Sequence, residues 1–217
     1  MDKCFAIFDM DGTLVDSMPY WNGIGADYLR KKGVTEDLTE LLERTKPMTM
    51  PETAAFFLDY FHLPDTPAAA AAEINAMMEA HYRSDIPAKP GVGAYLAELR
   101  RRGVAMCVAS ATGEALMRAC LRRLGLEEYF AFVLSCETVG AGKDSPAVYL
   151  AAAERLGAAP GETAVYEDAL NALRTAKQAG FYTVAVFDQS GAAQWEESKA
   201  LAEEALRDWR ETEAAGE

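Results

Sequence analysis

The 217-residue sequence predicts an α/β protein in which a parallel sheet is covered by helices and is interrupted, early in the chain, by a group of short helices. Two observations predict this fold. Short, uninterrupted apolar runs end abruptly at polar residues, as is typical of strands buried on both faces of a parallel sheet. From about residue 90 onward, these runs alternate with segments of helical periodicity, which favours parallel strands joined by helices.

The first strand is expected at residues 4–8, where five apolar residues precede Asp9. Asp9 and Asp11 would then lie at the carboxyl end of a parallel strand, the edge at which open α/β sheets bind their ligands. Side chains two residues apart on an extended segment point to the same face, and two such carboxylates repel each other unless a cation lies between them. Mg²⁺ prefers oxygen ligands of this kind. An ordinary strand followed by an Asp–Gly turn at Gly12 explains the same residues.

Residues 17–86 are predicted to form a separate helical domain, and residues 1–16 together with 87–217 the α/β core domain. The helical segments begin near Met18, Glu36, Pro51 and Ala68. Each carries apolar residues three or four positions apart, which predicts a compact bundle of four helices. The methionine and aromatic residues on these faces are interpreted as the core of the bundle rather than as a cofactor site.

In the core domain, four further strands alternate with helices. The strands are expected at residues 104–109, 131–134, 163–166 and 182–187, and the helices at 93–102, 113–124, 146–156 and 169–179. The tail from Ala192 is predicted to be helical, with a frayed acidic end.

The composition excludes several classes of partner. A formal net charge of −13 argues against binding to nucleic acid or to an anionic membrane. The four cysteines have no short spacing, so they form neither a zinc pattern nor a dense disulfide framework, and they suit a reducing cytoplasm. No apolar run is long enough for a membrane span or a signal peptide. We therefore expect a cytoplasmic monomer or weak dimer.

Polar residues follow several of the predicted strands and converge on one edge of the sheet. They are Asp9 and Asp11 after the first strand, Ser110 after the second, Lys143 in the loop before the fourth, and Glu167 and Asp168 after the fourth. Each has an ordinary explanation, such as a helix cap for Ser110 or a surface side chain for Lys143. Together they predict a crevice with several carboxylates, a hydroxyl and an ammonium, which needs a cation and is typical of phosphoryl transfer.

Three other site patterns do not fit the sequence. An EF-hand calcium loop needs ligands at its fifth and twelfth positions, which are Thr13 and Tyr20 when counted from Asp9. A P-loop ending at Lys143 would need a Gly at the position of Glu137 and a Ser or Thr at that of Asp144. A serine hydrolase would need a Gly-x-Ser-x-Gly segment, which the sequence lacks.

Four segments resemble, in order, the motifs of the haloacid dehalogenase (HAD) superfamily of phosphotransferases. They are residues 8–17, 108–110, 142–149 and 166–180. The resemblance covers nearly the whole chain and implies a Rossmann-like, HAD-like core. The helical insertion after the first motif resembles the cap domain of the subgroup that contains β-phosphoglucomutases and phosphoglycolate phosphatases. A four-helix cap domain is therefore implied for residues 17–86.

The resemblance implies roles for the residues that handle the phosphate. Asp9 would be the nucleophile that forms an aspartyl-phosphate, and Asp11 would act as general acid and then as general base. Ser110 and the backbone N–H of Ala111 would bind the phosphate, close to a helix N-terminus that favours an anion. Lys143 would neutralise the charge of the phosphate and of Asp9.

The resemblance also implies a Mg²⁺ site. The ligands would be Asp9, Asp168 and Asp11, the last of these through its backbone carbonyl, with Glu167 and Thr13 supporting them. Ala169 and Ala172 depart from the pattern, since relatives often have Ser and Gly at these two positions.

These roles predict a Mg²⁺-dependent phosphatase that acts on a small phosphorylated metabolite. Two alternatives stay open: a β-phosphoglucomutase-like sugar-phosphate mutase, and a non-catalytic protein that binds a phosphorylated ligand. The mutases carry a His and an Arg near the positions of Trp21 and Met50, and neither indole nor thioether can replace those groups. They also usually carry Val or Ile where this chain has Thr13. Substrate selection is expected from Trp21, Arg44, Lys46 or the loop at residues 48–50.

Overall fold

The computed structural model describes residues 3–45, 48 and 50–212. The chain divides into two compact units. One comprises Met1–Met18 and Asp85–Glu217, and the other comprises Pro19–Ser84. We call them the core unit and the helical unit. The assignment of the helical unit as a cap stays a prediction.

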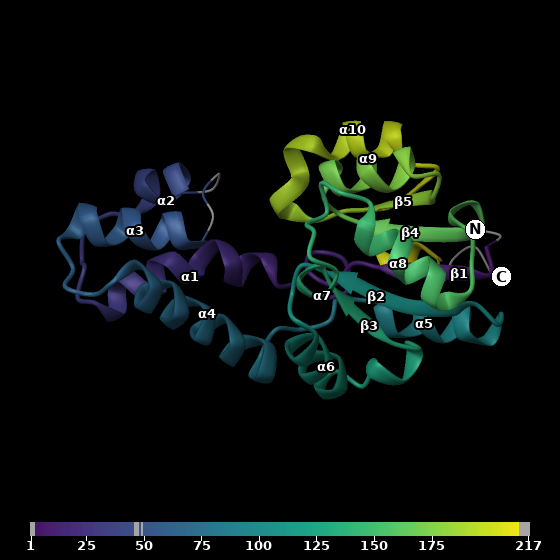
Figure 1. Ribbon diagram of the computed structural model, residues 1–217, viewed down its shortest axis with the longest axis horizontal. Coiled ribbons are helices and arrows are strands. Elements are labelled where there is room, and N and C mark those ends of the chain that lie inside the picture. Colours follow the sequence, from purple (N-terminus) through teal and green to yellow (C-terminus); the bar gives the residue numbers. More distant parts are fainter. Residues whose placement is uncertain (1–2, 46–47, 49, 213–217) are drawn as a thin grey trace. The chain divides into compact units, whose positions relative to one another are not determined.

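The core unit contains a six-stranded sheet in the order β3-β2-β1-β4-β5-β6 (Figure 1). The strands are β1 (Phe5–Phe8), β2 (Ala105–Ser110), β3 (Val133–Ser135), β4 (Thr163–Glu167), β5 (Tyr182–Val186) and β6 (Glu204–Leu206). All five neighbouring pairs are parallel, which confirms the predicted α/β fold. The strand β1 lies between β2 and β4, so the residues that follow it have neighbours from both of these strands.

Helices cover both faces of this sheet, which explains the uninterrupted apolar runs. They are α5 (Val92–Arg101), α6 (Glu114–Arg123), α7 (Cys136–Val139), α8 (Ala147–Leu156), α9 (Leu170–Gln178) and α10 (Trp195–Leu201). On one face, Ile7 and Val165 belong to a buried cluster with residues of α8 and α9. On the other face, the rings of Phe8 and Tyr166 stack with centroids 4.3 Å apart, and Trp209 packs over Tyr166.

The C-terminal segment differs from the prediction. We expected helix from Ala192, but after α10 the chain forms β6, which pairs in parallel with β5. The three residues of β6 contain no apolar run, so the sequence gives no sign of a strand, and only the pairing with β5 defines it. Trp209 lies in a 3-10 turn (Trp209–Thr212), is 2 % exposed, and donates its indole N–H to the carbonyl of Thr13 at 3.2 Å. This part of the tail therefore packs against the loop that follows β1.

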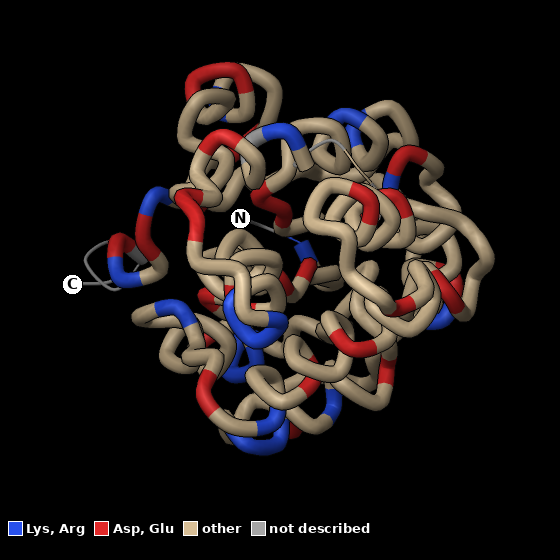
Figure 2. The backbone as a smooth tube through the Cα atoms, turned by 90° about the vertical axis from the view of Figure 1, so that its left-hand side faces the viewer, with Lys and Arg blue, Asp and Glu red and all other residues tan. Residues whose placement is uncertain are grey.

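The helical unit contains four helices in its described part. They are α1 (Met18–Lys31), α2 (Thr39–Thr45), α3 (Met50–Phe61) and α4 (Pro67–Ser84). Tyr28, Phe57, Ile74 and Met78 are buried between them, which confirms that these stripes form the core of the bundle. Within the described residues of both units, no helix is long and apolar enough to cross a membrane. Acidic residues outnumber basic ones along the chain (Figure 2), which disfavours a polyanionic partner such as nucleic acid.

Candidate active site

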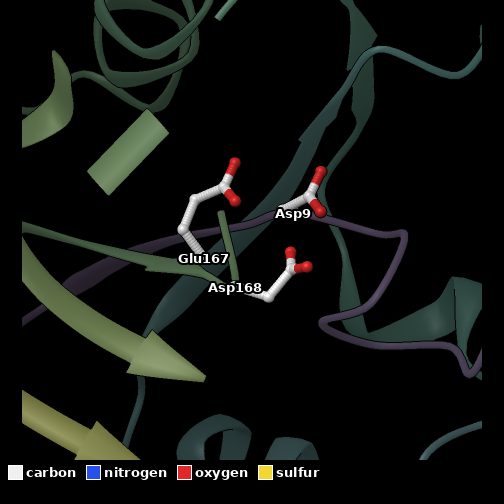
Figure 3. A group of neighbouring side chains, drawn as sticks. All are labelled: Asp9, Glu167 and Asp168. Carbon is white, nitrogen blue, oxygen red and sulfur yellow. The ribbon is translucent and has the colours of Figure 1, made fainter. Parts of the chain in front are cut away.

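Three carboxylates converge at the carboxyl edge of the central strands. Asp9 continues β1, because its N–H donates to the carbonyl of Tyr166 at 2.9 Å, and Glu167 and Asp168 come from the end of β4. Figure 3 shows the three side chains around one small space. Each offers an oxygen, and these three oxygens lie within 4.8 Å of one another. Asp9 and Glu167 are almost completely buried, with exposed fractions of 4 % and 1 %.

A tight turn brings the loop after β1 against Asp168. Gly12 has a φ of +76°, a conformation that side chains other than glycine rarely adopt. A Cβ at this position would lie 2.8 Å from Cγ of Asp168, so a larger residue would push the carboxylate away. The next residue, Thr13, is fully buried and donates its hydroxyl to Asp168 at 3.2 Å. Thr13 therefore contacts Asp168 directly, and its supporting role in a metal site stays a prediction.

Lys143 supplies the positive charge beside these acids. Its ammonium pairs with both Asp9 and Glu167, and the hydroxyl of Tyr149 donates to the same oxygen of Glu167 at 2.8 Å. Burial alone would lower the pKa of Lys143, but the two carboxylates raise it overall, so the ammonium keeps its charge. Tyr149 was not among the predicted site residues. Its place in the first turns of the helix after Lys143 could have indicated it.

One ammonium does not balance three carboxylates, of which those of Asp9 and Glu167 are buried and that of Asp168 is half-buried. Burial, followed by the nearby acids, raises the pKa of Asp9 well above its usual range despite the attraction of Lys143. Burial and the charge of Glu167 raise the pKa of Asp168 to about 7. Such shifts are expected where a cation belongs, and a set of carboxylate oxygens suits a hard divalent ion such as Mg²⁺. The residues present therefore fit the predicted metal.

The side chain of Asp11 lies in different surroundings. The hydroxyl of Ser17 donates to its Oδ1 at 2.7 Å, and the hydroxyl of Thr112 donates to its Oδ2 at 2.6 Å. Ser110 also donates to Oδ2, at 3.4 Å. Among the described residues, the group of potential metal ligands includes Glu167 and not the carboxylate of Asp11. The predicted contribution of Asp11 through its backbone carbonyl stays a prediction.

Ser110 and Ala111 lie at the end of β2 and in the turn that leads into α6, and their binding of a phosphate stays a prediction. Ser110 is the last residue of β2 and is 1 % exposed. Ala111 follows it and leads into α6, whose N-cap is Gly113. Backbone N–H groups at the start of a helix favour an anion. Thr112 was not among the predicted site residues. It lies in this same turn, two residues after Ser110, and that spacing could have indicated it.

The predicted substrate-selecting residues belong to the helical unit. Trp21, Met48 and Met50 line a cavity of about 530 Å³ within this unit, while Arg44 is exposed on α2. Lys46 and the middle residue of the loop at 48–50, Thr49, lie outside the described residues.

Comparisons with known proteins agree with this geometry. Residues 6–180 match the hydrolase family described as haloacid dehalogenase-like hydrolase. Hexitol phosphatase A of Escherichia coli (strain K12) is 31 % identical over 183 residues, which span 83 % of this chain and 81 % of that protein. A phosphorylated carbohydrates phosphatase of Thermotoga maritima is 28 % identical over 180 residues, 80 % of each chain.

Solved structures share the fold over nearly the full length. CbbY from Rhodobacter sphaeroides, crystallised with phosphate, is 26 % identical with a TM-score of 0.70, and the match covers 96 % of both chains. A HAD family hydrolase from Deinococcus radiodurans R1 has a TM-score of 0.76 at 24 % identity, over 98 % of this chain and 94 % of that one. The predicted enzyme class, a phosphoric monoester hydrolase, is confirmed, and the chain belongs to the haloacid dehalogenase-like hydrolase family.

Proposed function

We propose that this protein is a Mg²⁺-dependent phosphatase that removes the phosphate from a small phosphorylated sugar or sugar alcohol. The observation that carries the proposal is the pairing of Asp9 with Lys143, next to the carboxylates of Glu167 and Asp168. The substrate class is supported by the relatives, which are named as phosphatases of hexitol phosphates and of phosphorylated carbohydrates.

The proposed reaction has two steps. Asp9 attacks phosphorus while the bond to the leaving oxygen breaks, and Asp11 gives that oxygen a proton, which yields an aspartyl-phosphate and a free alcohol. Asp11, now a carboxylate, takes a proton from water. The resulting hydroxide attacks phosphorus, the bond to Asp9 breaks, and inorganic phosphate leaves. Lys143 and the N–H of Ala111 offset the charge on the transferring group, and Ser110 orients it.

Asp9, Asp168 and the carbonyl of Asp11 would hold the Mg²⁺. When bound, the ion supplies positive charge that balances the acids and the phosphate oxygens. Glu167, tied to Lys143 and Tyr149, would keep the ammonium directed at Asp9. The test is to remove divalent ions with EDTA and to measure phosphate release from a panel of sugar phosphates. Activity should vanish and return with Mg²⁺, and a protein that is inactive on the whole panel with Mg²⁺ would instead be a phosphate-binding protein.

Hydrolysis is proposed over phosphate transfer between two hydroxyls of a sugar. The indole N–H of Trp21 donates to the hydroxyl of Tyr82 at 3.0 Å, and indole has no acceptor for a proton relay. The direct assay supplies β-glucose 1-phosphate with Mg²⁺ and follows glucose 6-phosphate and free phosphate together. Glucose 6-phosphate forming much faster than free phosphate would identify a mutase.

We further propose a cytoplasmic location. The four cysteines are all unpaired, which suits a reducing compartment.

A further inference from the structure

The carboxylate of Asp11 is contacted by hydroxyl groups from two segments that are far apart in the sequence. Ser17 reaches one oxygen from the loop after β1, and Thr112 reaches the other from the turn after β2. The Thr112 contact, at 2.6 Å, is shorter than those of Ser17, at 2.7 Å, and Ser110, at 3.4 Å. The two oxygens of Asp11 therefore have different partners, which fixes the rotation of the carboxylate.

These contacts orient Asp11 differently from Asp9. The hydroxyl groups of Ser17, Thr112 and Ser110 donate to the carboxylate of Asp11, whereas Asp9 pairs with the ammonium of Lys143. A hydrogen bond is directional, so donors on both oxygens of Asp11 restrain the direction in which the carboxylate points.

We propose that Thr112 is a positioning residue that aims Asp11 at the leaving oxygen of the substrate. This inference depends on the proposed function, because it needs Asp11 to be the general acid. Thr112 is itself held: its N–H donates to the hydroxyl of Ser110 at 3.2 Å, and its branched side chain has few rotamers. Through these two hydrogen bonds, Thr112 links Ser110 at the end of β2 to the carboxylate of Asp11. Neither the predicted roles nor the family motifs assign this task to Thr112.

A positioning residue for a general acid has a signature that a structural residue lacks. Protonation matters greatly for an alkoxide leaving group and little for p-nitrophenolate, which leaves without a proton. The value of kcat/KM reports phosphoryl transfer to Asp9, the step in which the leaving group departs. If Asp11 is no longer held in the orientation that protonates the leaving oxygen, kcat/KM should therefore fall far more for a sugar phosphate than for p-nitrophenyl phosphate.

The experiment compares Thr112→Val, which keeps the shape but not the hydroxyl, with Thr112→Ser, which keeps the hydroxyl. We expect Thr112→Val to lower kcat/KM by about tenfold or more on the most active sugar phosphate and by less than about threefold on p-nitrophenyl phosphate. Thr112→Ser should restore most of the loss. Thr138→Val is the matched control, since the Thr138 hydroxyl donates to Glu114 at 3.0 Å and not to Asp11. Thr112→Ala replaces Thr112→Val if the latter does not fold.

Equal losses on both substrates, or no loss on either, would overturn the role of Thr112. Asp11→Asn is measured in parallel to separate this outcome from a failure of the proposed function. If Asp11→Asn discriminates between the two substrates and Thr112→Val does not, only the inference on Thr112 is wrong. If Asp11→Asn itself affects both substrates equally, Asp11 is not the general acid and both proposals fall.

Discussion

Asp9 and Asp11 are two residues apart in one loop, yet their surroundings differ in kind. Asp9 is 4 % exposed, lies next to two further carboxylates, and pairs with the ammonium of Lys143. Asp11 is only partly buried and is contacted by the hydroxyls of Ser17 and Thr112. A neighbouring ammonium suits the proposed nucleophile, and directional hydroxyl contacts suit a carboxylate that has to be held in one orientation. The two aspartates therefore fit different proposed roles because their neighbours differ.

The largest expected effect is that of removing the nucleophile. Asp9→Asn should keep the fold and lower the rate by at least about 10³-fold, because an amide cannot form the aspartyl-phosphate. The loss should be similar on p-nitrophenyl phosphate and on a sugar phosphate, unlike the losses expected for Asp11→Asn and Thr112→Val. Steady-state kinetics on both substrates with Mg²⁺ check this. Near-native activity of the purified variant would show that Asp9 is not the nucleophile.

Lys143→Met should lower kcat/KM by about 10²-fold on both substrates, because it removes charge stabilisation from the transferring phosphate. It also leaves Asp9 and Glu167 buried without their cation. Breaking a buried ion pair typically costs on the order of 3–5 kcal/mol, and Mg²⁺ should recover part of this loss. Thermal unfolding with and without Mg²⁺ measures the effect. A variant as stable and as active as the parent would mean that this ion pair is incidental.

Asp168→Ala should act through the metal rather than through the leaving group. We expect the Mg²⁺ concentration for half-maximal activity to rise at least about tenfold, since one carboxylate ligand is lost. The ratio of kcat/KM values for the two substrates at saturating Mg²⁺ should stay close to that of the parent. A Mg²⁺ titration is the measurement, and an unchanged titration curve would remove Asp168 from the ligand set.

The smallest effect is expected for Tyr149→Phe. It removes the hydrogen bond to Glu167 but leaves the pairing of Glu167 with Lys143. A net loss of about 1–2 kcal/mol in unfolding free energy and less than about tenfold in rate should follow. Urea unfolding and kinetics check this. A loss of stability and rate as large as that of Lys143→Met would show that the Tyr149 hydroxyl, and not the ion pair alone, keeps Glu167 and Lys143 in place beside Asp9.

Much of the fold could be predicted because buried parallel strands leave a simple pattern. The apolar run before Asp9 predicted β1, and similar runs predicted β2, β3, β4 and β5 of the same sheet. The strand β6 could not be predicted, because Glu204–Leu206 has no such run. Its pairing with β5 is accompanied by a hydrogen bond from the hydroxyl of Tyr182 to Glu204 at 2.7 Å, a contact across 22 positions of the chain.

The sequence by itself determined which residues gather at the carboxyl edge of the sheet, because parallel strands bring their carboxyl ends to one side whatever their order. That reasoning placed Asp9, Asp11, Ser110 and Asp168 together. Only the tertiary structure decided which residue meets which. With β1 between β2 and β4, Asp11 meets the turn after β2, and Asp9 meets the end of β4 and Lys143. Thr112 lies 101 positions from Asp11, and Lys143 lies 134 positions from Asp9. No local pattern in the sequence encodes contacts at such separations.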